Sequence, residues 1–159
     1  MATTSTIELK GYDEIKRLFS ELDSRGISAQ PLFAEIGLFL NAQIKQRTAE
    51  GLDAERKPFK PYSTRHAAKR ISLGLPADKV DLFFTGSMLS SMTSEEQERQ
   101  VRVFFMPTQD KFGGFNPAKA FFINESQGRE FFAISDADAD RILNIAATRL
   151  NSLLETAGR

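Results

Sequence analysis

The spacing of hydrophobic residues predicts two amphipathic helices in the first third of the chain. The first begins at Tyr12 and ends at Gly26, because glycine readily adopts the left-handed conformation found at helix ends. The second has Pro31 in its first turn and loses its periodicity before Gly51. The residues that recur at helical spacing are Ile15, Leu18, Phe19 and Leu22 in the first helix, and Phe33, Ile36, Leu40 and Ile44 in the second. Three further residues widen the second stripe and predict burial on more than one side: Leu32, Leu38 and Phe39.

The most clearly marked element is a helix that follows Ser135. The hydroxyl of Ser135 can cap its first turn, and Asp138 three residues later completes a variant of the capping box. Asp136 and Asp140 add negative charge where the helix dipole is positive. The helix is expected to end at Gly158, and its apolar stripe consists of Ile142, Ile145, Ala146, Leu150 and Leu153.

Between these helices the strand signals are short. In residues 101–106, Val101, Val103 and Phe105 alternate with Arg102 and Phe104, which predicts a strand. Residues 131–134 are a second strand candidate. Residues 118–126 fit either a helix or a strand. Residues 93–100 are a polar run in which Glu95, Glu96 and Glu98 are expected to be solvated.

Two short helices are expected among the loops of the middle region. One spans residues 64–70 with Ser63 as its cap, and the other spans residues 84–92 with Thr85 as its cap. Residues 6–10 read as a short strand or an ordered tail. Glycine, proline and polar residues predict further loops at 49–63, 72–81 and 107–117.

Together these elements predict an α+β fold, with several helices packed on a small, mostly antiparallel sheet and a long C-terminal helix. No internal repeat or domain boundary is visible, so residues 1–159 are expected to form a single domain. Residues 51–81 are expected to form an extended loop or arm. Loops of that length in compact domains are usually functional or disordered.

Composition excludes several classes of function. The chain has no cysteine, which rules out disulfides, thiolate nucleophiles and cysteine-based metal sites. Its formal net charge is zero, so a globally charged surface for nucleic acid or a membrane is absent. The N-terminal residues lack the basic start and apolar run of a signal peptide, and no stretch approaches the roughly 20 apolar residues of a membrane helix.

Phenylalanine is unusually frequent, with 14 copies against two tyrosines and no tryptophan. Because phenylalanine has no polar group, its ring has to be buried in a core or against a partner. Fourteen such rings are many for one small core. We therefore expect some of them to lie at an interface.

No motif predicts a catalytic, metal or cofactor site. The one histidine, His66, lies in a basic stretch typical of a solvated helix face, and no serine stands in a nucleophile-elbow pattern. Residues 136–140 resemble the start of a calcium loop, but Arg141 and Ala147 stand where that loop needs glycine and glutamate. Residues 111–115 are glycine-rich but lack the ending of a phosphate loop. We expect no enzyme, no cofactor and no small-molecule substrate.

One charge asymmetry stands out between residues 56 and 76, where six cations occur without an acidic residue. A solvated basic loop, docking against an acidic neighbour such as residues 95–98 of another subunit, and contact with DNA phosphates all fit this segment. Phe59 and Tyr62 lie among these charges, and the prolines beside them indicate rings that are fixed for packing. The candidate charged docking or DNA-facing residues are Arg56, Lys57, Lys60, Arg65, Lys69 and Arg70.

Three short blocks combine aromatic side chains with turn-forming or capping residues. They span residues 58–64, 82–89 and 124–132, and we refer to them as the first, second and third blocks. None contains the groups of a reaction centre. The blocks therefore indicate shape and docking rather than catalysis.

The order of these blocks before a capped C-terminal helix resembles the phage virion-morphogenesis, or tail-completion, family over residues 30–155. The first block matches an aromatic-x-Pro core followed by Ser or Thr, and the second matches a Leu-x-x-Thr-Gly-x-Leu segment with one residue of drift. The chain departs from the family pattern in lacking a glycine near Arg56, in having Phe for a usual Trp, and in having Glu130 for a proline. The matching residues are Phe59, Pro61, Tyr62, Ser63 and Thr64; Leu82, Thr85, Gly86 and Leu89; Asn124, Glu125 and Gly128; and Arg129, Phe131, Ile134, Ser135 and Asp136.

This resemblance implies a structural protein of a tailed phage rather than an enzyme. Such proteins form rings at the head–tail junction through which DNA passes, and six copies is the expected number here. The implied partners are other copies of the chain, portal or connector proteins, and tail-tube or terminator proteins, with non-specific DNA contact in the lumen and no membrane. The implied location is the head–tail junction of the virion, after assembly in the host cytoplasm.

Two alternatives stay open beside this interpretation. One is a tail-terminator ring protein, and the other is a DNA-binding accessory protein that uses residues 56–70. For the ring-forming protein, the candidate subunit or partner interface comprises Phe59, Pro61, Tyr62, Phe112, Phe115, Arg129 and Phe132.

Overall fold

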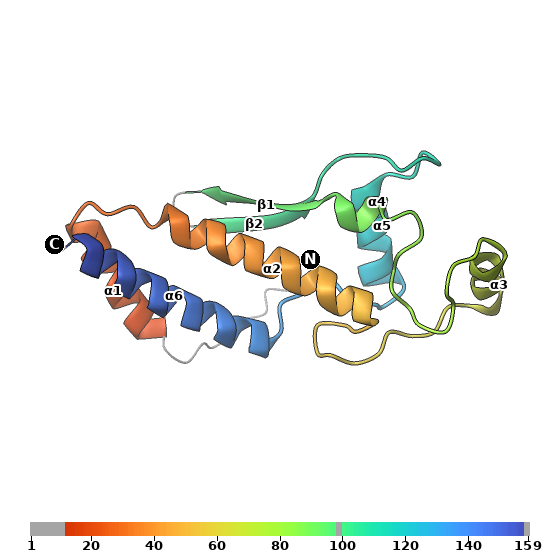
Figure 1. Ribbon diagram of the computed structural model, residues 1–159, viewed down its shortest axis with the longest axis horizontal. Helices are drawn as coiled ribbons and strands as arrows, with labels where there is room; N and C mark the ends of the chain where they lie inside the picture. The colour runs from red at the N-terminus through yellow and green to blue at the C-terminus, as the bar shows by residue number, and fades with distance from the viewer. Residues whose placement is uncertain (1–11, 98–99, 158–159) are drawn as a thin grey trace. The chain divides into compact units, whose positions relative to one another are not determined.

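A computed structural model describes residues 12–97 and 100–157 of the chain. Within these residues the fold is α+β, with six α-helices and a two-stranded antiparallel sheet, so the predicted fold class is confirmed. In chain order the elements are α1 (Tyr12–Ser24), α2 (Gln30–Glu50), α3 (Thr64–Ser72), α4 (Ser87–Ser90), β1 (Met92–Gln97), β2 (Gln100–Phe105), α5 (Asn116–Phe121), the π-helical turn η1 (Phe122–Ser126) and α6 (Asp136–Ala157) (Figure 1).

Contacts within the chain group into two compact units. The first unit takes the described parts of Met1–Leu38, Glu95–Arg102 and Ile134–Arg159, and the second takes those of Phe39–Ser94 and Val103–Ala133. The chain passes from one unit to the other within α2, within β1, within β2 and once more between Ala133 and Ile134, ahead of α6. The sequence predicts one domain without a linker, and three of these four passages occur inside regular elements.

The first unit is built from α1, α6, the start of α2, and the adjoining ends of β1 and β2. The apolar stripes of these helices were predicted, and they supply fully buried side chains such as Leu18, Leu32 and Leu150. The rings of Phe19 and Phe33 stack with their centroids 5.8 Å apart. Leu38 was expected to widen the buried stripe of α2, but that prediction is wrong because its side chain is 71% exposed.

Local capping signals position two helix ends as predicted. Gly26 follows α1 with φ +65°, a conformation that is strained for residues with a side chain. At the start of α6, the backbone N–H of Asp138 donates to Ser135 Oγ and the backbone N–H of Ser135 donates to Asp138 Oδ2, both at 3.1 Å. This reciprocal pair is the predicted capping box. Gly158, the expected end of α6, and residues 6–10 lie outside the described residues.

The second unit packs around one hydrophobic cluster to which all three blocks contribute. Phe59 comes from the first block, Met88 from the second and Phe131 from the third, and all three are at least 93% buried. The other buried members are Ile44, Val80, Met92 and Ala120. Blocks that are far apart in the sequence therefore share one core.

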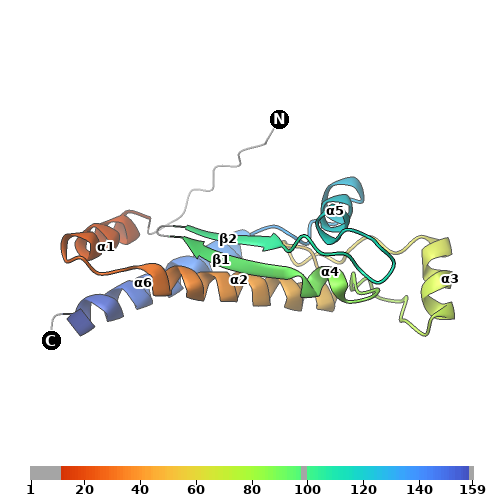
Figure 2. The same cartoon turned by 90° about the horizontal axis from the view of Figure 1, so that it is seen from above.

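The sheet is a hairpin in which β1 and β2 lie side by side (Figures 1 and 2). The strand predicted at 101–106 is confirmed as β2. The polar run at 93–100 carries no predicted strand, yet residues 92–97 form β1. Their sequence, Met-Thr-Ser-Glu-Glu-Gln, lacks an apolar alternation, so pairing with β2 rather than local pattern decides its conformation.

The second strand candidate, residues 131–134, is not a strand. The carbonyl oxygens of Phe131 and Ala133 accept hydrogen bonds from the guanidinium of Arg47, which is 3% exposed. These carbonyls are therefore satisfied by a side chain of α2 rather than by a neighbouring strand.

Residues 51–81 contain regular structure as well as loop. Residues 51–59 close on themselves through a bridge between Leu52 and Pro58 and through the amide of Phe59, which donates to the carbonyl of Gly51 at 2.9 Å. The predicted short helix follows as α3, and Ser63 Oγ caps it by accepting the backbone N–H of His66.

Two further predictions concern short helices. Residues 118–126, for which the sequence allows either a helix or a strand, are helical and lie in α5 and η1. The helix expected at 84–92 is shorter, since α4 covers four residues and begins after Gly86, although Thr85 Oγ1 does accept the N–H of Ser87. Gly86 has φ +76°, and a Cβ there would lie 2.7 Å from the Phe83 ring.

Candidate docking site

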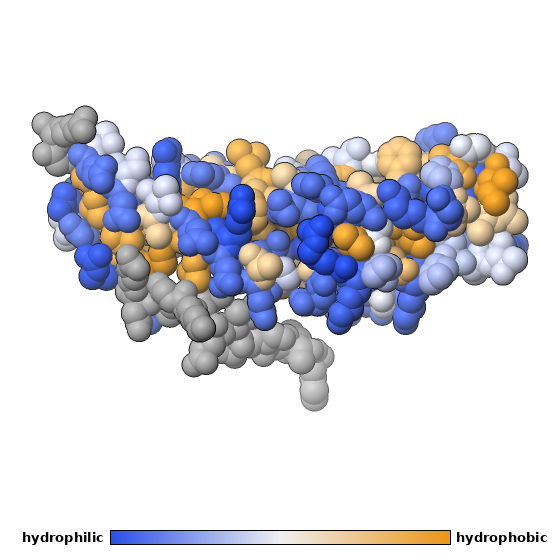
Figure 3. All heavy atoms as spheres, turned by 60° about the horizontal axis from the view of Figure 1, so that its bottom comes forward, coloured by the Kyte–Doolittle hydropathy of each residue, from blue (hydrophilic) through white to orange (hydrophobic). Residues whose placement is uncertain are grey.

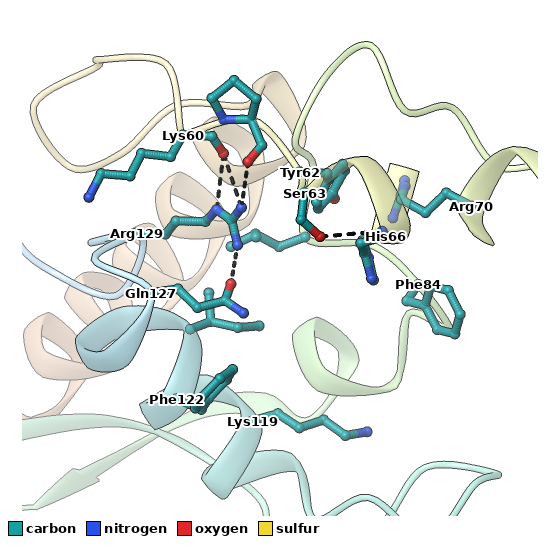
Figure 4. A pocket seen from close by; sticks show the side chains of 13 residues that line it. Lys60, Tyr62, Ser63, His66, Arg70, Phe84, Lys119, Phe122, Gln127 and Arg129 are labelled. Carbon is teal, nitrogen blue, oxygen red and sulfur yellow. Dashed lines mark hydrogen bonds between the residues drawn. The ribbon is translucent and has the colours of Figure 1, made fainter. Parts of the chain in front are cut away.

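Arg129 of the third block holds the first block in place. Its Nε and Nη2 donate to the carbonyl of Lys60 at 3.2 and 3.1 Å, and Nη2 also donates to the carbonyl of Pro61 at 3.1 Å (Figure 4). Its Nη1 donates to Oε1 of Gln127. Arg129 is 9% exposed, so its charge is used to fix the backbone of residues 60–61.

Arg70 of α3 plays a similar part beside the second block. It is 1% exposed, and its guanidinium donates to the carbonyls of Pro76 and Phe83 at 2.6 and 2.5 Å. It also forms an ion pair of 3.0 Å with Asp81. A planar guanidinium suits such multiple acceptors, and it ties α3 to residues 76–83.

Tyr62 lies against both of these arginines. Its ring centroid is 4.6 Å from the guanidinium carbon of Arg70 and 5.5 Å from that of Arg129. Its hydroxyl donates to Asp81 Oδ1 at 3.2 Å. Burial raises the pKa of Tyr62 above its ordinary value, although the charge of Arg70 opposes the shift. The ring is therefore kept neutral and fixed.

These residues line a pocket of about 610 Å³ in the second unit, which we call the basic pocket. Its lining combines cations with aromatic and aliphatic side chains and includes no carboxylate. The lining residues are Lys60, Pro61, Tyr62, Ser63, His66, Arg70, Leu82, Phe84, Lys119, Phe122, Ile123, Gln127 and Arg129. Figure 4 shows that these residues come from the first block, α3, the second block, the α5–η1 segment and the segment after η1, with the Lys60 side chain directed away from the others.

His66 connects the pocket to a row of rings. Its imidazole lies 4.9 Å from the Tyr62 ring and 5.9 Å from the Phe84 ring, centroid to centroid. The Phe84 ring in turn lies 6.4 Å from that of Phe112. Burial lowers the pKa of His66, and the nearby charge of Arg70 lowers it further. His66 is therefore a neutral ring of the pocket wall, where sequence analysis expected a solvated side chain.

The loop that presents Phe112 is organised by Asp110. Its carboxylate accepts the backbone N–H groups of Phe112 and Gly114 at 2.8 and 2.9 Å and forms an ion pair with Lys119. The hydrogen bond from Lys119 and those from the two amides hold the pKa of Asp110 below its ordinary value. A fixed loop thus carries Phe112, whose ring is 69% exposed.

Large apolar side chains are exposed over much of the second unit. They come from α3, the second block, the loop after β2, and the α5–η1 segment. Hydrophobic surface also interrupts the hydrophilic surface in separate places on the face drawn in Figure 3. The exposed residues of the second unit are Ile71, Leu73, Phe83, Met106, Phe112, Phe115, Phe121 and Phe122.

The structure places the predicted interface residues in different environments. Phe112, Phe115 and Pro61 are exposed, whereas Tyr62 and Phe132 are partly buried. Phe59 is 7% exposed and belongs to the core, and Arg129 is buried as a structural residue. For these last two residues the expected interface position is corrected.

The predicted charged residues divide in the same way. Five of them are exposed, while Arg70 is buried and bonded within the unit. Its expected place at a charged surface is therefore corrected. The five exposed cations are Arg56, Lys57, Lys60, Arg65 and Lys69.

Sequence analysis missed Phe121 and Phe122, which are 68% and 53% exposed. Two adjacent rings on one helix cannot both face the same core, and this was the available signal. His66 was also missed as a pocket residue, because its neighbours Tyr62 and Phe84 belong to two different blocks.

The arrangement favours binding over chemistry. Ser63 Oγ caps α3, and the Asp81 and Asp110 carboxylates are bound to cations. Within residues 12–97 and 100–157, no group of three or more His, Asp and Glu residues is placed to hold a metal ion. In the same part of the chain, no helix is long and apolar enough to span a bilayer.

Comparison with protein-family models, with curated proteins and with solved structures finds no match to this chain.

Proposed function

We propose that this chain is a structural protein of a tailed phage, a tail-completion protein that forms a ring at the head–tail junction. One observation carries the proposal. The three blocks on which the family resemblance rests meet in one core and one pocket, the exposed ring of Phe122 lines that pocket, and the exposed ring of Phe112 lies 6.4 Å from that of Phe84 in its wall. A rigid scaffold that presents unpaired apolar side chains is typical of a surface that binds other proteins.

The internal contacts of the pocket support a docking role. Buried arginines fix the loops, so that little conformational entropy is lost when a partner binds. Exposed phenylalanines such as Phe112 and Phe122 are available to enter pockets of a neighbouring protein, the part that aromatic residues commonly take at interfaces.

The proposal is tested by removing the chain from the phage that encodes it. We expect filled heads and complete tails that remain unjoined, and restoration of joined particles when the chain is supplied separately. A chain with Lys79→Glu, an exposed change outside the basic pocket, serves as the folded control and should restore joining as the unchanged chain does. Normal yields of joined, infectious particles without the chain would refute the proposal.

A second candidate function is binding of DNA through residues 56–70. The observation in its favour is that Arg56, Lys57, Lys60, Arg65 and Lys69 are exposed. Duplex DNA binding that weakens steeply with salt and is lost in Arg65→Glu/Lys69→Glu would support it. Binding unaffected by this double change would exclude the segment as the DNA contact.

A further inference from the structure

Charge is divided unequally between the two units. In the sequence ranges of the second unit, twelve Lys and Arg stand against eight Asp and Glu, for a formal charge of +4. In those of the first unit, nine Lys and Arg stand against thirteen Asp and Glu, for a formal charge of −4. The zero net charge of the chain is therefore the sum of two opposite charges. The first unit of one copy is complementary in charge to the second unit of another copy.

The basic pocket offers hydrogen-bond donors rather than acceptors. Gln127 Oε1 already accepts Arg129, which leaves its amide N–H groups, and Ser63 Oγ accepts a backbone N–H, which leaves its hydroxyl proton. The exposed side chain of Lys60 extends away from the other labelled side chains (Figure 4), so its ammonium group lies beside the pocket and faces solvent. The rings of Phe84 and Phe122 line the same pocket. Such a site suits a carboxylate that is carried on an apolar or extended polypeptide segment.

The first unit presents such carboxylates on β1. Glu95 and Glu96 are both exposed, and they lie next to each other in an extended strand. Glu95 is 3.8 Å from Arg102, with both side chains well exposed, and such pairs contribute little. Successive strand residues point to opposite faces, so Glu96 points away from the face of Glu95.

The other acidic cluster of the first unit, residues 136–140, already stabilises the start of α6. Asp138 is 8% exposed and caps α6, and Asp136 and Asp140 lie where the helix dipole stabilises negative charge. Moving them into a partner's pocket would remove that stabilisation. The strand carboxylates have no such role to lose.

We propose that the basic pocket of one copy binds the Glu95–Glu96 segment of a second copy, with the Glu96 carboxylate received by the Lys60 ammonium. This inference rests on the proposed ring, since it names the surfaces through which its copies join. Because the two surfaces differ, the contact is heterologous, and repeating it closes into a ring if the rotation permits.

The test exchanges the charges of the two residues and measures self-association by sedimentation velocity at low salt. We expect Lys60→Glu and Glu96→Lys each to weaken association about tenfold or more, because like charges then meet. Mixing the two variants should restore association, since each interface in the mixture again pairs opposite charges. Lys79→Glu and Glu155→Lys carry the same charge changes at exposed positions outside both surfaces, and should associate as the unchanged chain does.

Three results would overturn the inference. They are an unchanged chain that stays monomeric at low salt, single variants that associate normally, and a mixture that fails to recover.

DNA binding that requires Lys60, without self-association, would assign the pocket to nucleic acid instead. If the chain is found at the head–tail junction but the exchange has no effect, only this interface fails. If the exchange works but the phage joins heads and tails without the chain, the proposed function fails.

Discussion

Three arginines of the second unit, Arg47, Arg70 and Arg129, are at least 91% buried and donate to backbone carbonyls. A buried cation is costly unless several acceptors surround it, and each of these has them. The carbonyl groups that accept these hydrogen bonds lie in segments outside the helices and strands. Two of them, Arg70 and Arg129, line the basic pocket, and we infer that they set its shape by fixing the loops around it.

Replacing Arg129 should destabilise the second unit. Arg129→Met leaves the carbonyls of Lys60 and Pro61 without this donor, and we expect the free energy of unfolding to fall by about 2–4 kcal/mol. Urea denaturation measures this change. Arg65→Met, on an exposed side chain of α3, should change it by less than about 0.5 kcal/mol. Equal effects of the two substitutions would contradict the structural role of Arg129.

The aromatic residues should separate into core and surface classes. Phe131 is 0% exposed and contacts the rings of Phe105 and Phe132, so Phe131→Ala should cost about 3–5 kcal/mol of unfolding free energy. Phe121→Ala, at 68% exposure, should cost less than about 0.5 kcal/mol. Thermal unfolding of both variants tests this division, and a large loss at Phe121 would be inconsistent with its exposure.

Sequence analysis misplaced Phe59, Arg70 and Arg129 for one physical reason. Whether a side chain is buried depends on partners that are distant in the sequence, and Arg129 bonds to carbonyls 68 and 69 residues away. No local pattern records such a partner. Exposed loop residues such as Phe112 need no distant partner, and for them the surface position was predictable.

At the scale of elements, the helices were predictable because their signals are local. The stripes and caps of α1, α2 and α6 lie within a few residues of the structure that they specify. β1 was missed because Thr93 to Gln97 are polar, and the strand forms through pairing with β2. The pocket likewise forms where three blocks meet in space. The order of the blocks along the sequence does not predict that they meet.

The cap of α6 gives a prediction at this scale. Ser135→Ala removes the acceptor for the N–H of Asp138, and we expect a loss of about 1 kcal/mol in unfolding free energy. Ser152→Ala makes the same chemical change at an exposed position within α6 and should be neutral or slightly stabilising. Denaturation curves that rank the two variants in the opposite order would refute the cap.

The loop of Asp110 should loosen in acid. The pKa of Asp110 in the folded protein lies below its ordinary value of 3.8. The carboxylate therefore stabilises the loop fully above pH 3.8, and this stabilisation is lost as the pH falls through the folded pKa. The amide resonances of Phe112 and Gly114, followed by NMR, should therefore titrate with a midpoint below 3.8, and Asp110→Asn should abolish this titration. A midpoint at or above 3.8 would contradict the hydrogen bonds assigned to this carboxylate.

At the scale of the whole molecule, surface features of two kinds support the proposed assembly. The second unit carries exposed aromatic side chains and a donor-rich pocket, and the sequence ranges of the two units have opposite formal charges. Complementary charges favour a defined orientation between copies, while exposed apolar rings supply contact area. In a ring, every copy presents one of its two surfaces to one neighbour and the other surface to its second neighbour, so both features are used.

The most direct test of this account is cryo-electron microscopy of purified virions of the phage that encodes the chain. The account predicts a closed ring of this chain at the head–tail junction, with aromatic residues of the second unit at contacts between proteins. Joined virions that lack the chain, or that carry it away from the junction, would contradict it.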